Sequence, residues 1–435
     1  MKTIRAGQSK AVPTMFVVFA FAPLLVGAPG DENWDRNFGV PGVDGRICAM
    51  AVSGNELYVG GDFSRINALN TTNIARWDGT NWCALGPGLG EQNIRGVRAL
   101  LVADHEVYAA GVFTKSGDRA IAPVAKWNGR EWRGLADNIA GGVVALAWDG
   151  TNLYVGGVFR SIGGINASNV AKWDGTSWSP LGLGVHEWRT GIVGGPIDLA
   201  KVYALTVWDG SLYVGGEFEI AGTLNTTNLA RWNGMTWSAV GGRLPIVSAL
   251  LADEACLYAV TGGAIACWNG TSWSPLGGTN NGPVGVSAFV KSGSDLYAGG
   301  LLPSLTGVPV NHVGKWDGMR WSALGSGIDT SGVVLAMASN GSELFVSGVF
   351  NSSGGKPATN IARWRIPHAL KINRASNDAL LSWPATGSNL ALESTACLGV
   401  NGWSNVPNPV AIHEGECLVT NEISGPSRAY RLSGR

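Results

Sequence analysis

The chain has 435 residues and a formal net charge of zero at pH 7, and 14% of its residues are charged, against about 25% in an average soluble domain. A neutral chain without a basic excess lacks the charge signature of a nucleic-acid-binding protein, so no nucleic-acid partner is expected. Its 64 glycines and 19 tryptophans instead favour an all-β fold with many turns.

Residues 1–30 have the layout of a secretory signal peptide. Three basic residues precede an apolar stretch over residues 15–26, and small residues follow it before Asp31. An apolar stretch of this length is too short to cross a bilayer. The sequence therefore predicts cleavage after residue 30, export to the cell surface or beyond, and no transmembrane span in the mature chain. An uncleaved anchor is the alternative.

A unit of about 48 residues then recurs seven times, which is typical of propeller blades. Each unit contains an aromatic residue in a context such as "LYVGG", at Tyr58, Tyr108, Tyr154, Tyr213, Tyr258, Tyr297 and Phe345. A tryptophan follows each of them, at Trp77, Trp127, Trp173, Trp232, Trp268, Trp316 and Trp364. In the first six units a second tryptophan comes five residues later.

Each unit predicts four short strands, as in residues 143–148, 153–159, 169–173 and 178–182. Asp-Gly or Asn-Gly between the third and fourth strands is typical of a hairpin turn. Seven such units predict a seven-bladed β-propeller over residues 31–366. The seventh unit lacks its fourth strand, and the segment "NWDRNFGVPG" has the missing pattern. We therefore expect an N-terminal strand to complete the last blade and close the ring, which removes open sheet edges.

The pattern "LYVGG…WDGxxWxxLG" resembles the kelch-type propeller repeat. It is more similar still to the propeller repeats of the fungal cortical polarity-marker family and of related exported bacterial proteins. The resemblance covers about residues 33–365. It implies a propeller fold and no particular activity.

Residues 367–435 depart from the repeat and predict five or six short strands, which would form a small C-terminal β-sandwich. The segment resembles the compact module that ends many exported bacterial proteins. That resemblance implies a role in surface attachment or sorting.

The exported part contains six cysteines, and an oxidising compartment permits disulfides. Cys256 and Cys267 flank a short predicted hairpin, and Cys397 and Cys417 lie together in the tail. Each pair is a candidate disulfide, with two buried thiols as the alternative. The cysteine and histidine spacing predicts no metal site.

The candidate binding residues lie where the repeat is interrupted, because loops on a rigid scaffold commonly carry function. The longest interval contains an irregular segment over residues 185–201, which includes His186, Glu187, Trp188 and Arg189. This segment should share a face with the polar loops between second and third strands. Alternatively, it only packs across the ring.

Two carboxylates, Asp62 and Glu217, follow the glycine pairs of their units and are further candidates at the mouth of the ring. Ordinary solvated turn residues are the alternative interpretation.

The sequence contains no recognisable catalytic or cofactor motif. It predicts a non-catalytic binding scaffold, secreted or at the cell envelope, for an extracellular protein or glycan and without a cofactor. One alternative is a polysaccharide-active enzyme with Glu187 or His186 as acid or base. A purely structural surface protein is another.

Overall fold

The computed structural model describes residues 28–91, 96–189, 197–277 and 285–367, and seven short segments between residues 371 and 434. Most of the predicted signal peptide lies outside this part of the chain. The described residues form strands and turns, together with one short 3-10 helix, η1 (Asp31–Asn33). Within the described residues, no helix has the length and apolar character needed to cross a membrane. The fold is all-β and of the propeller type.

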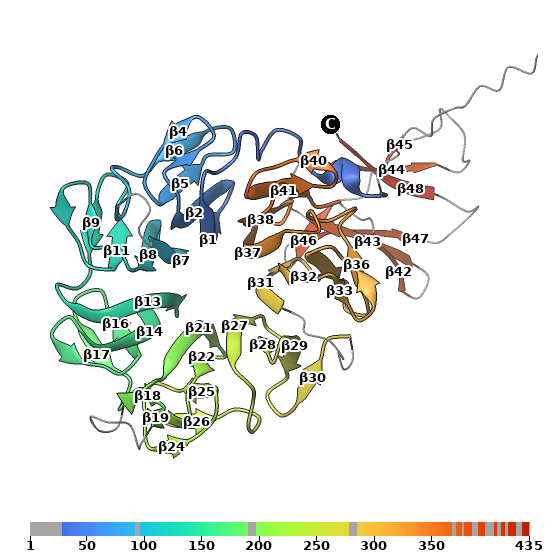
Figure 1. Cartoon of the computed structure of the whole chain (residues 1–435). Helices are drawn as coiled ribbons and strands as arrows, with labels where there is room; N and C mark the ends of the chain where they lie inside the picture. Colours follow the sequence, from blue (N-terminus) through green and yellow to red (C-terminus); the bar gives the residue numbers. More distant parts are fainter. Residues whose placement is uncertain are drawn as a thin grey trace, which may run out of the picture.

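Seven antiparallel sheets follow one another around a ring within residues 46–365 (Figure 1). Their first strands are β1 (Arg46–Ser53), β7 (Val97–Ala103), β13 (Ile139–Trp148), β21 (Lys201–Trp208), β27 (Val247–Ala252), β31 (Gly285–Ser292) and β37 (Val333–Ser339). Their second strands are β2 (Glu56–Asp62), β8 (Glu106–Gly111), β14 (Leu153–Ile162), β22 (Ser211–Glu217), β28 (Leu257–Thr261), β32 (Asp295–Leu301) and β38 (Glu343–Val349).

The third strands end on the first tryptophan of each repeat or one residue after it: β5 (Ile74–Trp77), β11 (Val124–Trp127), β16 (Val170–Trp173), β25 (Leu229–Trp232), β29 (Ala264–Trp268), β35 (Val313–Trp316) and β41 (Ile361–Arg365). The fourth strands begin on the second tryptophan: β6 (Trp82–Ala84), β12 (Trp132–Gly134), β17 (Trp178–Pro180), β26 (Trp237–Ala239), β30 (Trp273–Pro275) and β36 (Trp321–Ala323). The first strands are innermost, and each contacts the next around the ring, including β37 with β1 (Figure 1).

Tryptophans and glycines join neighbouring sheets. The indole N–H of Trp178 donates a hydrogen bond to the Leu135 carbonyl of the preceding sheet over 2.7 Å. Trp132, Trp237 and Trp321 make the equivalent bond to the sheet before theirs. A Cβ on Gly60 would lie 2.5 Å from Cγ1 of Val97 in the next sheet. The paired glycines therefore allow the sheets to approach closely, as the repeat predicts.

Residues 33–42 do not form the predicted strand, so the prediction that a strand completes the last sheet is wrong. The segment makes a single antiparallel bridge, between Trp34 and Trp364, and the Asp35 amide donates to the Arg363 carbonyl. The Asp35 carboxylate then accepts the amides of Asn37 and Phe38. That turn ends the extended backbone directly after the bridge.

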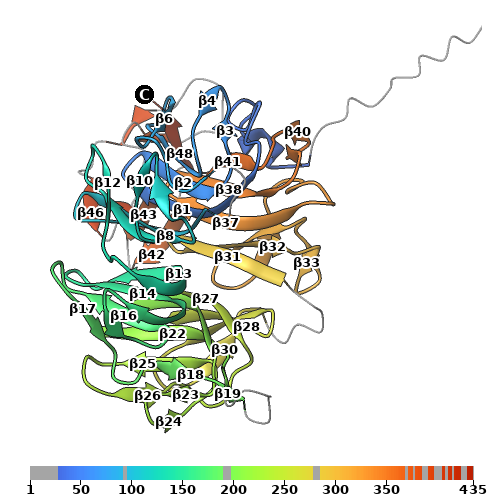
Figure 2. The same cartoon turned by 60° about the vertical axis from the view of Figure 1, so that its left-hand side comes forward.

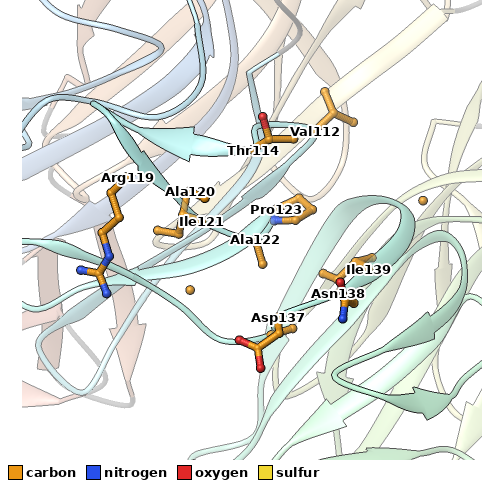
Figure 3. Close-up of a pocket in the computed structure, with 13 residues that line it drawn as sticks. Val112, Thr114, Arg119, Ala120, Ile121, Ala122, Pro123, Asp137, Asn138 and Ile139 are labelled. Atoms are coloured by element: carbon orange, nitrogen blue, oxygen red, sulfur yellow. The ribbon is translucent and has the colours of Figure 1, made fainter.

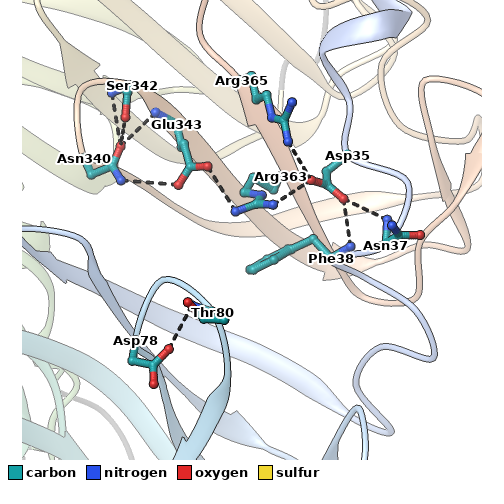
Figure 4. Close-up of polar contacts among 10 residues, drawn as sticks. All are labelled: Asp35, Asn37, Phe38, Asp78, Thr80, Asn340, Ser342, Glu343, Arg363 and Arg365. Carbon is teal, nitrogen blue, oxygen red and sulfur yellow. Dashed lines mark hydrogen bonds and ion pairs between the residues drawn. The ribbon is translucent and has the colours of Figure 1, made fainter. Parts of the chain in front are cut away.

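Side chains nevertheless hold this segment against the seventh sheet (Figure 4). The Asp35 carboxylate lies 2.6 Å from the Arg363 guanidinium, which also pairs with Glu343. Phe38 is buried beneath Arg363, with the guanidinium carbon 4.9 Å from its ring centre. Trp34 is 1% exposed, and its indole N–H donates to Leu324 of the sixth sheet.

Every first strand carries an extra residue at the same point. The register with the second strand shifts there in all seven sheets, which is the mark of a β-bulge. The skipped residues are Cys48, Arg98, Val144, Tyr203, Ser248, Ser287 and Leu335.

Short outer hairpins connect the second and third strands. They consist of β3 (Arg65–Ile66) with β4 (Leu69–Asn70), β9 (Lys115–Ser116) with β10 (Arg119–Ala120), the end of β14 with β15 (Ile165–Asn166), β23 (Ile220–Ala221) with β24 (Leu224–Asn225), β33 (Ser304–Leu305) with β34 (Val308–Pro309), and β39 (Ser352–Ser353) with β40 (Lys356–Pro357). In the fifth sheet β28 turns directly into β29, and a disulfide joins Cys256 to Cys267 there.

A polar side chain ties most of these outer hairpins to the following linker. Asn169, with a left-handed φ of 66°, accepts the Phe159 amide through Oδ1 and donates through Nδ2 to the Val185 carbonyl, over 3.1 and 2.9 Å. We call this arrangement the asparagine staple. The same position carries Asn73, Asn228, His312 and Asn360, all with positive φ and equivalent bonds.

Two further sheets lie in the C-terminal region. One has the order β42 (Lys371–Ala375), β43 (Asp378–Pro384), β47 (Glu416–Glu422), β46 (Ala411–His413), and the other the order β45 (Ser404–Asn405), β44 (Leu390–Thr395), β48 (Ala429–Gly434). Leu381, Trp383 and Val419 of the first sheet and Leu392 of the second share one buried cluster.

Candidate functional site

The irregular segment after the third sheet is anchored on the outer hairpin of the fourth. Its first strand, β18 (Val185–His186), pairs with β23, and β19 (Trp188–Arg189) pairs with β20 (Ile197–Asp198). Figure 2 shows β18, β19, β23 and β24 gathered at one end of the molecule. The segment therefore shares a face with the loops between second and third strands, as expected from the sequence.

Asp198 organises this segment, and the sequence analysis missed it. Its Oδ1 accepts the amides of Glu187 and Ala200, and its Oδ2 lies 2.7 Å from Nδ1 of His186. The other ring nitrogen of His186, Nε2, lies 2.7 Å from the Leu183 carbonyl. Both nitrogens thus face acceptor oxygens, so the protonated ring can donate to both. These bonds hold the imidazole in one orientation.

Trp188 lies flat on this fixed imidazole. The two ring centres are 5.3 Å apart and the planes differ by 12°. Trp188 is 48% exposed, whereas most of the repeat tryptophans pack between sheets. A large, exposed and immobilised aromatic surface is well suited to stacking with a ligand.

A cavity of about 530 Å³ opens beside Trp188 and His186. Its wall includes Asn166, Ser168 and Asn225 from the outer hairpins of the third and fourth sheets. No Asp, Glu, Lys or Arg lines it among the described residues. The site therefore offers an aromatic face, amides and hydroxyls, with the imidazole as its one ionisable group in that part of the chain. We call it the Trp188 cavity.

The remaining candidates of the irregular segment do not take part in this surface. Glu187 is 5% exposed and does not line the cavity. The side chain of Arg189 lies outside the described part of the chain.

The two carboxylates that follow glycine pairs lie on different sheets and outside the Trp188 cavity. Asp62 pairs with Arg98 of the next sheet over 2.8 Å, and Glu217 pairs with Lys201 over 2.7 Å. Arg98 also donates to the Cys48 sulfur. Burial raises the pKa of the Cys48 thiol more than the nearby Arg98 charge lowers it, so this thiol stays protonated at neutral pH.

The second candidate disulfide pair lies partly outside the described residues. Cys417 carries a free thiol, and Cys397 lies in a segment that the structure does not describe. Across the described chain, His, Cys, Asp and Glu form no group of three or more that could hold a metal ion.

A second cavity, of about 570 Å³, lies between the second and third sheets (Figure 3). Thr114, Arg119 and Pro123 line it from the second sheet, and Asp137 and Asn138 from the linker to the third. The sequence analysis did not find it. The signal that it overlooked is Pro123, which replaces the asparagine or histidine of the other outer hairpins.

No protein-family model matches the chain, and no curated protein matches it. Solved structures with a similar arrangement include the extracellular domains of two hybrid two-component systems from B. thetaiotaomicron, with TM-scores of 0.49 and 0.43 and identities of 13% and 9%. The first alignment covers 83% of this chain and 42% of that domain, so this chain spans less than half of its length. The second covers 90% of this chain and 54% of that domain. BamB from Moraxella catarrhalis matches with a TM-score of 0.38 and 12% identity over 74% of this chain and 85% of its own.

Proposed function

We propose that this chain is a non-catalytic binding scaffold that works outside the cytoplasm and takes a glycan onto the Trp188 cavity. The observation that carries the proposal is the exposed Trp188 indole stacked on a His186 ring that is itself held at both nitrogens. An aromatic ring fixed in this way presents a preorganised stacking surface and loses little side-chain freedom on binding.

The walls of the cavity favour a neutral glycan over a protein partner. Carboxamides of Asn166 and Asn225 and the Ser168 hydroxyl can donate and accept hydrogen bonds, and a sugar offers many hydroxyl partners at close spacing. The described lining lacks the carboxylates and basic groups that would recognise a charged ligand. The volume lies within the range usual for small-ligand pockets.

The alternative of a polysaccharide-active enzyme receives little support. Its proposed acid or base, Glu187, is buried away from the cavity, and a general acid must reach the bond that it cleaves. His186 has both nitrogens engaged by the protein's own oxygens.

We also propose the architecture that such a role requires. Residues 1–30 act as an export signal, and the seven sheets act as the blades of a closed propeller of the kelch-like kind. The N-terminal segment takes the place of the missing fourth strand of the last blade, held by Trp34 and Asp35. Residues 367–435 then form a separate small β-sandwich.

Binding and turnover should be measured together on the purified exported chain. We would incubate it with soluble neutral polysaccharides (laminarin, glucomannan and dextran), with an acidic one (alginate), and with envelope extract, and record both bound ligand and released products. We expect binding to a neutral polysaccharide without product. Trp188→Ala should weaken that binding at least tenfold, which corresponds to about 1.4 kcal/mol.

Met235 provides a matched control, because it is a large apolar residue in the turn between β25 and β26, is 84% exposed and lies outside the cavity. Met235→Ala should bind like the unmodified chain. Released oligosaccharides, or equal binding by the Trp188→Ala variant, would overturn the proposal. Trp188-dependent binding of a protein from the extract would support the location of the site and overturn the choice of a glycan as its ligand.

A further inference from the structure

The cavity between the second and third sheets lies where the asparagine staple is interrupted. In the second sheet the staple position carries Pro123, which has no carboxamide and no N–H. Proline also fixes φ near −65°, so it cannot adopt the left-handed conformation of Asn169. The loop keeps the bonds from the Gly111 amide to the Pro123 carbonyl and from the Ile121 amide to the Thr114 carbonyl, but it loses the side-chain bridge.

Three backbone groups consequently lack the partner that their equivalents have. The Phe113 carbonyl corresponds to that of Phe159, which accepts the Asn169 amide, and a proline has no N–H to donate. The Phe113 amide corresponds to that of Phe159, and it makes no hydrogen bond to any described residue. The Ile139 carbonyl corresponds to that of Val185, and it receives no side-chain amide from the staple position. Phe113 is 1% exposed, and leaving a buried amide without a partner costs about 1–3 kcal/mol.

Ile139 belongs to the wall of the cavity, and Phe113 lies directly between two residues of that wall. Val112 and Thr114, on either side of Phe113, line it, and so does Ile139 (Figure 3). The missing staple would have supplied one carbonyl acceptor and one N–H donor between these two points. A ligand that carries an amide group offers the same pair.

We propose that this second cavity binds the acetamido group of an N-acetylated sugar. The ligand carbonyl accepts from the Phe113 amide, and the ligand N–H donates to the Ile139 carbonyl, so the acetamido group takes the place of the absent asparagine side chain. The site is separate from the Trp188 cavity and does not depend on the function proposed there.

The surroundings of this pair favour a sugar over a peptide segment. Ala120, Ala122 and Gly134 leave room in the wall, and Arg119, Asp137 and Asn138 surround it with polar groups for hydroxyls. A bound peptide strand would instead need a row of donors and acceptors along a sheet edge. The interrupted staple leaves one donor, the Phe113 amide, and two acceptors, the Phe113 and Ile139 carbonyls.

The test compares N,N′-diacetylchitobiose with cellobiose, the matched disaccharide that lacks acetamido groups. Binding is measured by saturation-transfer NMR and by calorimetric titration of the full exported chain. We expect diacetylchitobiose to bind with its acetyl methyl groups the most strongly saturated, and cellobiose to bind at least tenfold more weakly. Equal affinity for the two sugars, or binding of neither, would overturn the proposal.

Variants assign the binding to this cavity. Ala120→Trp fills it from an exposed position and should remove binding. Ala255 is an exposed alanine in the turn between β27 and β28, and Ala255→Trp should leave binding unchanged. Pro123→Asn restores the staple residue and should also weaken binding at least tenfold, with Pro123→Ala as its control. If Pro123→Asn fails to fold by circular dichroism, Ala120→Trp decides alone.

Two further measurements separate this inference from its competitors. Ala120→Trp should remove diacetylchitobiose binding and leave polysaccharide binding at the separate Trp188 cavity unchanged, because Ala120 does not line that cavity; a loss of both would overturn the separation of the two sites. N-acetylglycine methylamide serves as a peptide probe. Tighter binding of this peptide than of the sugar would overturn the choice of ligand.

Discussion

The asparagine staple of the third sheet makes a sharp prediction about stability. Asn169 is 4% exposed, and replacing it by glycine removes the carboxamide while the backbone can keep its φ of 66°. The Phe159 amide and the Val185 carbonyl then both lose their side-chain partner. At about 1–3 kcal/mol for each buried group, Asn169→Gly should lower the free energy of unfolding by about 2–6 kcal/mol.

Urea unfolding followed by circular dichroism measures this loss as a shift of the midpoint at unchanged slope. The matched control is Asn81→Gly, an exposed asparagine in a turn whose side chain makes no hydrogen bond to the described residues. That control carries only the entropy cost of a new glycine, about 0.5–1 kcal/mol. Equal midpoints for the two variants would refute the claim that the staple joins hairpin and linker.

Three further predictions concern the closure of the ring and the fifth sheet. Trp34→Ala should destabilise the chain by about 3–5 kcal/mol, because the ring is 1% exposed and its N–H is bonded; an unchanged melting temperature would contradict this. Replacing both Cys256 and Cys267 by serine should cost about 3 kcal/mol, the loop-closure estimate for a separation of 11 residues, and reduction of the unmodified chain should give the same urea midpoint. Although burial raises the pKa of Asp35, bonds from the Asn37 amide and Arg363 outweigh it and lower that pKa overall. The resulting stabilisation is complete above about pH 3.9, the pKa of an aspartate in the unfolded chain, and is lost as the pH falls through the lower pKa of the folded state. Asp35→Asn should reduce this loss of unfolding free energy at acid pH. An unchanged dependence of stability on pH would contradict the assignment.

The repeated strands can be predicted from the sequence because short local motifs determine them. Asp-Gly and Asn-Gly turns and paired tryptophans mark the third and fourth strands of each unit, and these two strands were expected at nearly their observed positions. The prediction of an N-terminal strand was wrong because the Asp35 carboxylate accepts the two amides that follow it and forms a turn. A comparison of repeats does not reveal such a local turn.

The candidate sites were only partly predictable. The interruption of the repeat pointed to His186 and Trp188. The contact between His186 and Asp198 could not be predicted, because both residues lie in an inserted segment that has no equivalent in the other units. Burial of Glu187 is likewise a tertiary property. The sequence shows Pro123 at the position of the staple asparagines. Its effect can be inferred only once the hydrogen bonds of those asparagines are known.

The recurrent bulge of the first strands has a consequence for how this molecule can acquire new chemistry. The same backbone irregularity holds side chains as different as the thiol of Cys48, the phenol of Tyr203 and the isobutyl group of Leu335. Side chains at bulges are released from the pairing of the ladder. The ring thus has seven equivalent bulge positions, and the residue at each can be replaced without changing the others. The tryptophans and asparagine staples farther from the axis hold the sheets together independently of these replacements.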